Sequence, residues 1–151
     1  MKYNLEITID LPRDKVIEKF DNPDNMKYWQ KGFISFEHLD GEPGTRGATS
    51  RLKYKWGKRE MEMIETITER SLPDAFHGTY DTKGAFNIQR NYFYDQGNQT
   101  RWVSETEFEF SGLMKFMAFF MGKKAFKKQS LQFMEDFKSF AEGNPRYAAD
   151  S

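Results

Sequence analysis

The sequence predicts an α+β fold in which a curved antiparallel sheet of seven strands wraps around one long C-terminal helix. Two short helices are expected after the first strand. Residues 2–10 alternate between apolar and polar side chains, as a half-buried strand does. Residues 47–110 contain strand-like segments separated by glycine turns. Residues 111–143 contain no proline and many apolar side chains at helical spacing. A helix on the concave side of a curved sheet buries both apolar faces.

The first elements follow from alternation and from capping signals. One face of the first strand collects its apolar residues, namely Tyr3, Leu5, Ile7 and Ile9. Pro12 suits the first turn of a helix, and Asn22 is a candidate N-cap for a second short helix that ends near Trp29. Residues 33–39 then form a predicted strand, and the glycines and proline of residues 41–47 indicate a loop.

Charge patterning fixes the register of the next hairpin. A two-residue turn at Gly57-Lys58 places Lys53 opposite Glu62 and Lys55 opposite Glu60 on one face. The other face then pairs Ser50, Leu52, Tyr54 and Trp56 with Glu65, Met63, Met61 and Arg59. A slip of one residue would lose both the charge pairs and the apolar face.

Two further turns extend the sheet. A turn at Gly97-Asn98 places Arg90 opposite Glu105. The inner face then receives Ala85, Asn87, Gln89, Asn91 and Phe93 with Phe110, Phe108, Thr106, Ser104 and Trp102. A turn at Lys83-Gly84 adds Phe76, Gly78 and Tyr80 to that face and directs His77 outward.

The C-terminal segment has two different halves. The second half carries an apolar stripe at steps of three and four, which consists of Phe126, Ser130, Phe133, Phe137 and Phe140. The first half is apolar on nearly all sides, through Leu113, Met114, Phe116, Met117, Phe119, Phe120 and Met121. Such a helix must be covered on several sides or must contact something apolar outside the core. We interpret Lys123, Lys124, Lys127 and Lys128 as the solvated side of the helix.

Composition limits the possible classes of protein. The 151 residues suit a single domain, 1–151, and the balance of 23 basic against 23 acidic residues gives no global field for nucleic acid. The absence of cysteine excludes disulfides and thiolate nucleophiles and fits a reducing compartment. Residues 1–30 show no signal-peptide pattern, and the apolar cluster 113–121 is too short to span a membrane. We therefore expect a cytoplasmic protein, a monomer or weak homodimer, without stable membrane insertion.

Several different short segments follow one another along the whole chain in a recognisable order. They are residues 7–12 with Val16, residues 21–29, the loop 41–47, Leu72-Pro73, and Ser111-Gly112-Leu113-Met114. In this order and spacing the chain resembles the START-type helix-grip superfamily (SRPBCC), in its polyketide cyclase/dehydrase and lipid-transport branch. The resemblance implies a seven-stranded sheet that grips the C-terminal helix, 112–142, around a deep cavity for hydrophobic or amphipathic ligands. It implies no particular reaction, because the branch contains carriers, cyclases and proteins of unknown activity.

Few residues offer catalytic chemistry. His38 and His77 have no metal-binding spacing and are expected on the surface, and no glycine-rich phosphate loop is present, so we expect no metal or cofactor. Glu65 is placed inward between Met63 and Ile67, where desolvation would raise the pKa of its carboxyl and suit a general base. The alternatives are a β-bulge near Met63-Ile64 that turns Glu65 to solvent, or a simple ion pair.

A ligand pocket is the main functional expectation. Aromatic residues make up 17% of the chain, more than a small core usually needs. Asn87, Gln89 and Asn91 form an inward row of amides that would bond one another and water or hold the polar group of a ligand. The predicted lining consists of Leu52, Tyr54, Trp56, Met61, Met63, Phe76, Tyr80, Asn87, Gln89, Asn91, Trp102, Ser104, Thr106, Phe108, Met114, Met117, Phe120 and Met121.

Two functions remain open on the sequence. The first is binding or transport of a small hydrophobic or amphipathic molecule, lipid-like or polyketide-like. The second is a cofactor-independent cyclase, dehydratase or hydrolase with Glu65 as general base. We favour binding, because no set of nucleophile, base and orienting group can be assembled. A third alternative, which can coexist with lipid carriage, is transient membrane contact through residues 113–121.

Overall fold

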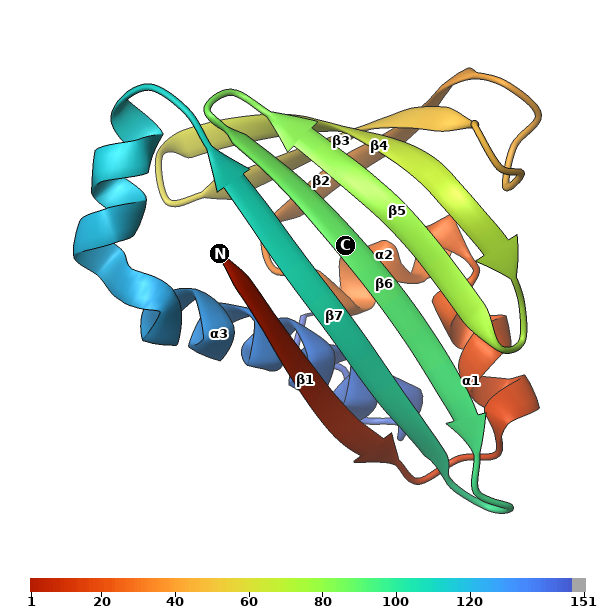
Figure 1. Cartoon of the computed structure of the whole chain (residues 1–151). Coiled ribbons are helices and arrows are strands. Elements are labelled where there is room, and N and C mark those ends of the chain that lie inside the picture. Colours follow the sequence, from red (N-terminus) through yellow and green to blue (C-terminus); the bar gives the residue numbers. More distant parts are fainter. Residues whose placement is uncertain (148–151) are drawn as a thin grey trace.

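The computed structural model describes residues 1–147 and contains a seven-stranded antiparallel sheet in the order β1-β7-β6-β5-β4-β3-β2. Figure 1 shows α3 along one side of the curved sheet, with α1 at the lower right of the view and α2 nearer its centre. The elements are β1 (Lys2–Ile9), α1 (Arg13–Phe20), η1 (Pro23–Asn25), α2 (Met26–Trp29), β2 (Phe33–Asp40), β3 (Thr49–Trp56), β4 (Arg59–Ser71), β5 (Ala75–Thr82), β6 (Ala85–Asp95), β7 (Thr100–Phe110) and α3 (Leu113–Ala141). This arrangement confirms the predicted fold class.

The predicted strand register is also correct. Lys53 lies opposite Glu62, and Lys55 opposite Glu60, around the turn that joins β3 to β4. Arg90 lies opposite Glu105 between β6 and β7. The ion pairing differs from the expectation, however, because Glu62 pairs with its diagonal neighbour Arg51, with Nε and Oε1 2.6 Å apart. The longer, planar guanidinium offers the better geometry for a carboxylate.

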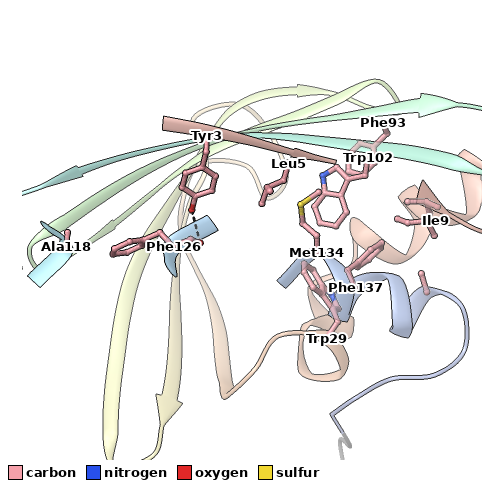
Figure 2. Close-up of a cluster of buried hydrophobic side chains, with 12 residues drawn as sticks. Tyr3, Leu5, Ile9, Trp29, Phe93, Trp102, Ala118, Phe126, Met134 and Phe137 are labelled. Carbon is pink, nitrogen blue, oxygen red and sulfur yellow. Dashed lines mark hydrogen bonds between the residues drawn. The ribbon is translucent and has the colours of Figure 1, made fainter. Parts of the chain in front are cut away.

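The core lies where the second half of α3 crosses the end of the sheet near α1 and α2. Phe137 has no exposed surface, and its ring centroid lies 4.9 Å from that of Trp29 and 5.5 Å from that of Trp102. Figure 2 shows these side chains converging between β1, the strands behind it and α3. Tyr3 joins the two layers, because its hydroxyl donates to the carbonyl of Phe126, 3.1 Å away. The predicted stripe of α3 therefore does face the core.

The helix α3 is not continuous, although the sequence suggested an unbroken one. The backbone leaves the helical region at Gly122, with φ 79° and ψ 158°, a conformation that essentially only glycine adopts without strain. Two helical segments result, 113–121 and 123–141. None of the helices among residues 1–147 is long and apolar enough to cross a bilayer.

The first segment of α3 is held by few contacts and leaves most of its apolar surface uncovered. Ala118 is buried, and Met114 lies so close to the β5–β6 turn that a Cβ at Gly84 would be 2.6 Å from its Cγ. The remaining apolar side chains are exposed by 40 to 83%, namely Leu113, Phe116, Met117, Phe119, Phe120 and Met121. A helix that is apolar on all sides must be covered by the protein or contact something apolar outside the core, and this segment is not covered.

Candidate functional site

A row of polar side chains crosses the inner face of the sheet. Ser50 on β3, Glu65 on β4, Tyr80 on β5 and Asn87 on β6 lie opposite one another in successive strand pairs. Because side chains alternate along each strand, the pairing directs all four to the same face. Ser50, Glu65 and Asn87 are each exposed by only 5 to 7%.

Glu65 is the one carboxylate of this row, and it points inward as predicted. The irregularity in β4 falls between Ile67 and Glu69 rather than at Met63-Ile64, so it leaves Glu65 on the inner face. Among the described residues Glu65 has no ion-pair partner. Both alternatives to a buried carboxyl are thereby excluded.

The electrostatics of Glu65 follow from burial and from one hydrogen bond. Burial raises the pKa of the Glu65 carboxyl above its ordinary value, and the hydroxyl of Tyr80, which donates to Oε2 at 2.9 Å, lowers it in part. Burial, together with the nearby Glu65 charge, also raises the pKa values of the Tyr80 and Tyr54 hydroxyls. Both phenols are therefore neutral hydrogen-bond donors across the physiological range.

Gln30 joins this cluster without any signal in the sequence. It lies at the end of α2, is 5% exposed, and accepts a hydrogen bond from the Tyr54 hydroxyl at 2.5 Å. No periodicity marks a residue that follows a one-turn helix, so only the packing of α2 against the sheet places Gln30 here.

The predicted amide row divides into two parts. Asn87 donates to the carbonyl of Glu107 at 3.0 Å and accepts from the Gln89 amide at 2.9 Å. Asn91 instead accepts from the indole nitrogen of Trp102 at 3.0 Å, inside the packed core. Asn87 and Gln89 thus remain beside the Glu65 cluster, whereas Asn91 holds a core residue in place.

The predicted lining residues fall into three groups by exposure. Seven are buried: Leu52, Tyr54, Asn87, Asn91, Trp102, Ser104 and Thr106. Seven inward-facing ones keep part of their surface: Met61, Met63, Phe76, Tyr80, Gln89, Phe108 and Met114. Four are exposed: Trp56, Met117, Phe120 and Met121.

Two single residues depart from their expected surroundings. Trp56 was expected inward, but it is 45% exposed at the end of β3, where its indole nitrogen donates to the carbonyl of Lys31 at 2.8 Å. His77 does point outward, yet only 12% of its side chain is exposed, because Glu69 and Tyr92 pack on it. His38 lies on the surface as expected.

Two hollows on the surface lie away from the inner row. One, of about 260 Å³, is lined by Pro12, Arg13, Asp14, Pro73, Asp95 and Gly97. The other, of about 370 Å³, is lined by Ile7, Thr8, Glu135, Lys138, Ser139 and Arg146. Within residues 1–147 no three histidine or acidic side chains gather as metal ligands would.

Comparison with known proteins gives structural matches only. No protein-family profile and no curated protein sequence matches the chain. Ara h 8.0201 superposes with a TM-score of 0.77 at 10% identity, over 95% of this chain and 99% of that one. Truncated norcoclaurine synthase from Thalictrum flavum gives 0.70 at 10%, over 95% and 94%. The di-domain ARO/CYC StfQ of the steffimycin biosynthetic pathway gives 0.71 at 12%, over 93% of this chain and 44% of that one. The chain thus has the helix-grip fold that its resemblance to the START-type superfamily implied.

Proposed function

We propose that this helix-grip protein binds a small hydrophobic or amphipathic molecule between the inner face of the sheet and the first half of α3. The observation that carries the proposal is the uneven packing of that face. At the α1–α2 end, Phe93, Trp102 and Phe137 are at most 1% exposed. Farther along the same face, Met61, Met63 and Tyr80 keep accessible surface although they point inward.

Protein interiors are packed as densely as organic crystals, so large inward side chains normally lose nearly all their exposure. Partly accessible methionines and aromatic rings on a concave face support our proposal that a ligand covers them. A mostly apolar surface with a few converging polar groups is the usual composition of a ligand site. Methionine adapts its shape readily to irregular ligands.

The polar row supports an amphipathic ligand rather than a pure hydrocarbon. Glu65 with Tyr80, and Asn87 with Gln89, place hydrogen-bonding groups side by side within the apolar surface. The raised pKa of Glu65 favours its neutral form, which can donate a hydrogen bond to a carbonyl or hydroxyl oxygen. The ligand class we propose therefore has an apolar body and one uncharged oxygen-bearing end.

A second candidate function is proton transfer on such a ligand. It is favoured by a specific observation, the buried Glu65 carboxyl in contact with the neutral Tyr80 phenol, because perturbed carboxyls gather at catalytic sites. Two structural neighbours carry names of catalysts, norcoclaurine synthase and an ARO/CYC protein. We place binding first, since Ser50, the hydroxyl opposite Glu65, makes no hydrogen bond to its carboxyl among the described residues, so no activated nucleophile is formed. We also propose that the protein is cytoplasmic, because a chain without cysteine suits a reducing compartment.

Native mass spectrometry of freshly purified protein tests the binding proposal. We expect a co-purified small molecule, or saturable binding of an added medium-chain fatty alcohol, which has an apolar body and one uncharged oxygen, with a thermal shift. Glu65→Gln should keep binding, since glutamine can still donate to the ligand oxygen, whereas Glu65→Leu should weaken it. Failure of a broad panel of apolar and amphipathic ligands to bind would refute the proposal. Turnover of a bound ligand that disappears in Glu65→Gln would favour the catalytic alternative.

A further inference from the structure

The strongest remaining feature is the exposed face of the first α3 segment, whose residues Met117, Phe120 and Met121 were predicted to line the ligand site but lie on the surface. Six large apolar side chains lie on it within nine residues: Leu113, Phe116, Met117, Phe119, Phe120 and Met121. Phe119 and Phe120 are exposed by 81% and 83%, nearly as much as in an unfolded chain. Contiguous apolar surface of this kind marks a contact surface rather than scattered chance exposure. We call these six residues the docking patch.

Charge around the docking patch is strongly one-sided. No acidic residue occurs from Phe110 to Met134, while five lysines do: Lys115, Lys123, Lys124, Lys127 and Lys128. All five are exposed, and none forms an ion pair with the residues that the structure describes. The chain as a whole is neutral, so this local excess of five positive charges is not a consequence of composition.

From these two observations we propose that the docking patch rests on an anionic membrane surface. Apolar side chains that enter the headgroup region beside lysines that meet lipid phosphates are the features of an interfacial helix. The segment is too short to span, and Gly112 and Gly122, both with positive φ, bound it on either side. The segment therefore projects as a separate unit from the second half of α3, as Figure 1 shows.

A second copy of the chain fits the docking patch less well. A symmetric dimer through the docking patch would gather the lysines of both copies at one interface, and like charges across an interface oppose association. An anionic bilayer satisfies both the apolar side chains and the lysines. The proposal is independent of ligand binding, because vesicle association does not require an occupied pocket.

Flotation of the full chain with vesicles tests the proposal. The protein should float with an equal mixture of phosphatidylcholine and phosphatidylglycerol, remain at the bottom with phosphatidylcholine alone, and be released by high salt. Lys127→Gln with Lys128→Gln should lower the partition coefficient about fivefold per lysine. Phe116→Ser with Phe119→Ser should lower it about tenfold or more.

Matched controls distinguish the docking patch from the general surface. Ile34→Ser removes an apolar side chain exposed by 46% on β2, and Lys15→Gln with Lys27→Gln removes two exposed charges from α1 and α2; both should float as the wild type does. The proposal is wrong if the wild type does not float, or if the docking-patch variants float equally well. It is also wrong if the patch instead mediates a dimer that the variants abolish and vesicles do not bind. If the phenylalanine variant fails to fold, the flotation of the lysine variant and the effect of salt on the wild type still test the proposal.

Discussion

At the scale of single residues, Glu65 is the most important residue of the proposed ligand site. Strand alternation and the hairpin register place it inward, and the structure gives it one partner, the hydroxyl of Tyr80. A carboxyl in this position is costly in its charged form, because burial removes water that the single hydrogen bond does not replace. The buried carboxyl therefore lowers the free energy of unfolding at neutral pH, and this loss can be measured as a function of pH.

The first prediction is that Glu65→Gln becomes increasingly stabilising, relative to the wild type, as pH rises above about 4.5. The pKa of Glu65 is raised in the folded protein above its ordinary value of 4.5, so between the two values the folded state holds more protons than the unfolded one. The wild type's free energy of unfolding must then fall as pH increases until the folded-state value is passed. Glutamine does not titrate and escapes this loss.

Chemical denaturation at a series of pH values measures the difference directly. Tyr80→Phe provides a control, because it removes the hydrogen bond that lowers the pKa of Glu65 and should deepen the wild-type trend. A constant difference between the wild type and Glu65→Gln at all pH values would show that Glu65 is hydrated in the folded protein.

At the scale of elements, the two halves of α3 have opposite relations to the core. We predict that Phe137→Ala lowers the free energy of unfolding by roughly 3–5 kcal/mol, the cost of a large cavity in a packed core. Phe137 has no exposed surface and contacts rings from α2, β7 and α1. Phe119→Ala is the matched control and should change stability by less than about 0.5 kcal/mol, since Phe119 is 81% exposed. Equal effects of the two substitutions, measured by denaturant unfolding, would contradict this division of the helix.

The break in α3 supports a separate prediction. Gly122→Ala should lower stability by roughly 1–3 kcal/mol, because an L-residue is strained at φ 79° and ψ 158°. No atom lies within 4 Å of a Cβ built there, so the cost would come from the backbone and not from a clash. Lys123→Ala, one residue later in the helical segment, should be close to neutral. A stabilised Gly122→Ala protein would mean that α3 is straight in solution.

Elements differ in how far the sequence could predict them. Opposite charges flanking Gly57 and Gly97 allow one register for each hairpin, and both registers are correct. The break at Gly122 could not be predicted, because an isolated glycine within a helical pattern is usually tolerated. For a related reason Gln30 was not predicted and the inward prediction for Trp56 was wrong, since both residues lie where an element ends and tertiary packing alone decides the direction of the side chain.

At the scale of the whole molecule, the fold separates a stabilising end from a functional end. The rings of α1, α2 and the second half of α3 fill one end of the concave face, as Figure 2 shows for Trp29, Phe93, Trp102 and Phe137. The other end keeps partly accessible methionines, the polar row and the exposed docking patch. Stability is thus concentrated away from the residues proposed for binding, so substitutions in the proposed site should alter affinity more than melting temperature.

A filling substitution at Met63 tests whether the inner face of the sheet adjoins space for an apolar ligand. We would titrate the wild type and Met63→Trp with the uncharged fluorescent probe Nile red and record both melting temperatures. We expect saturable binding by the wild type and loss of binding in Met63→Trp, with little change in melting temperature. Phe116→Ser with Phe119→Ser should still bind, which separates the inner site from the docking patch. The proposed site does not exist if Met63→Trp destabilises the protein by about 1–3 kcal/mol, as in an overpacked core, and the wild type either does not bind the probe or binds it no better than Met63→Trp does.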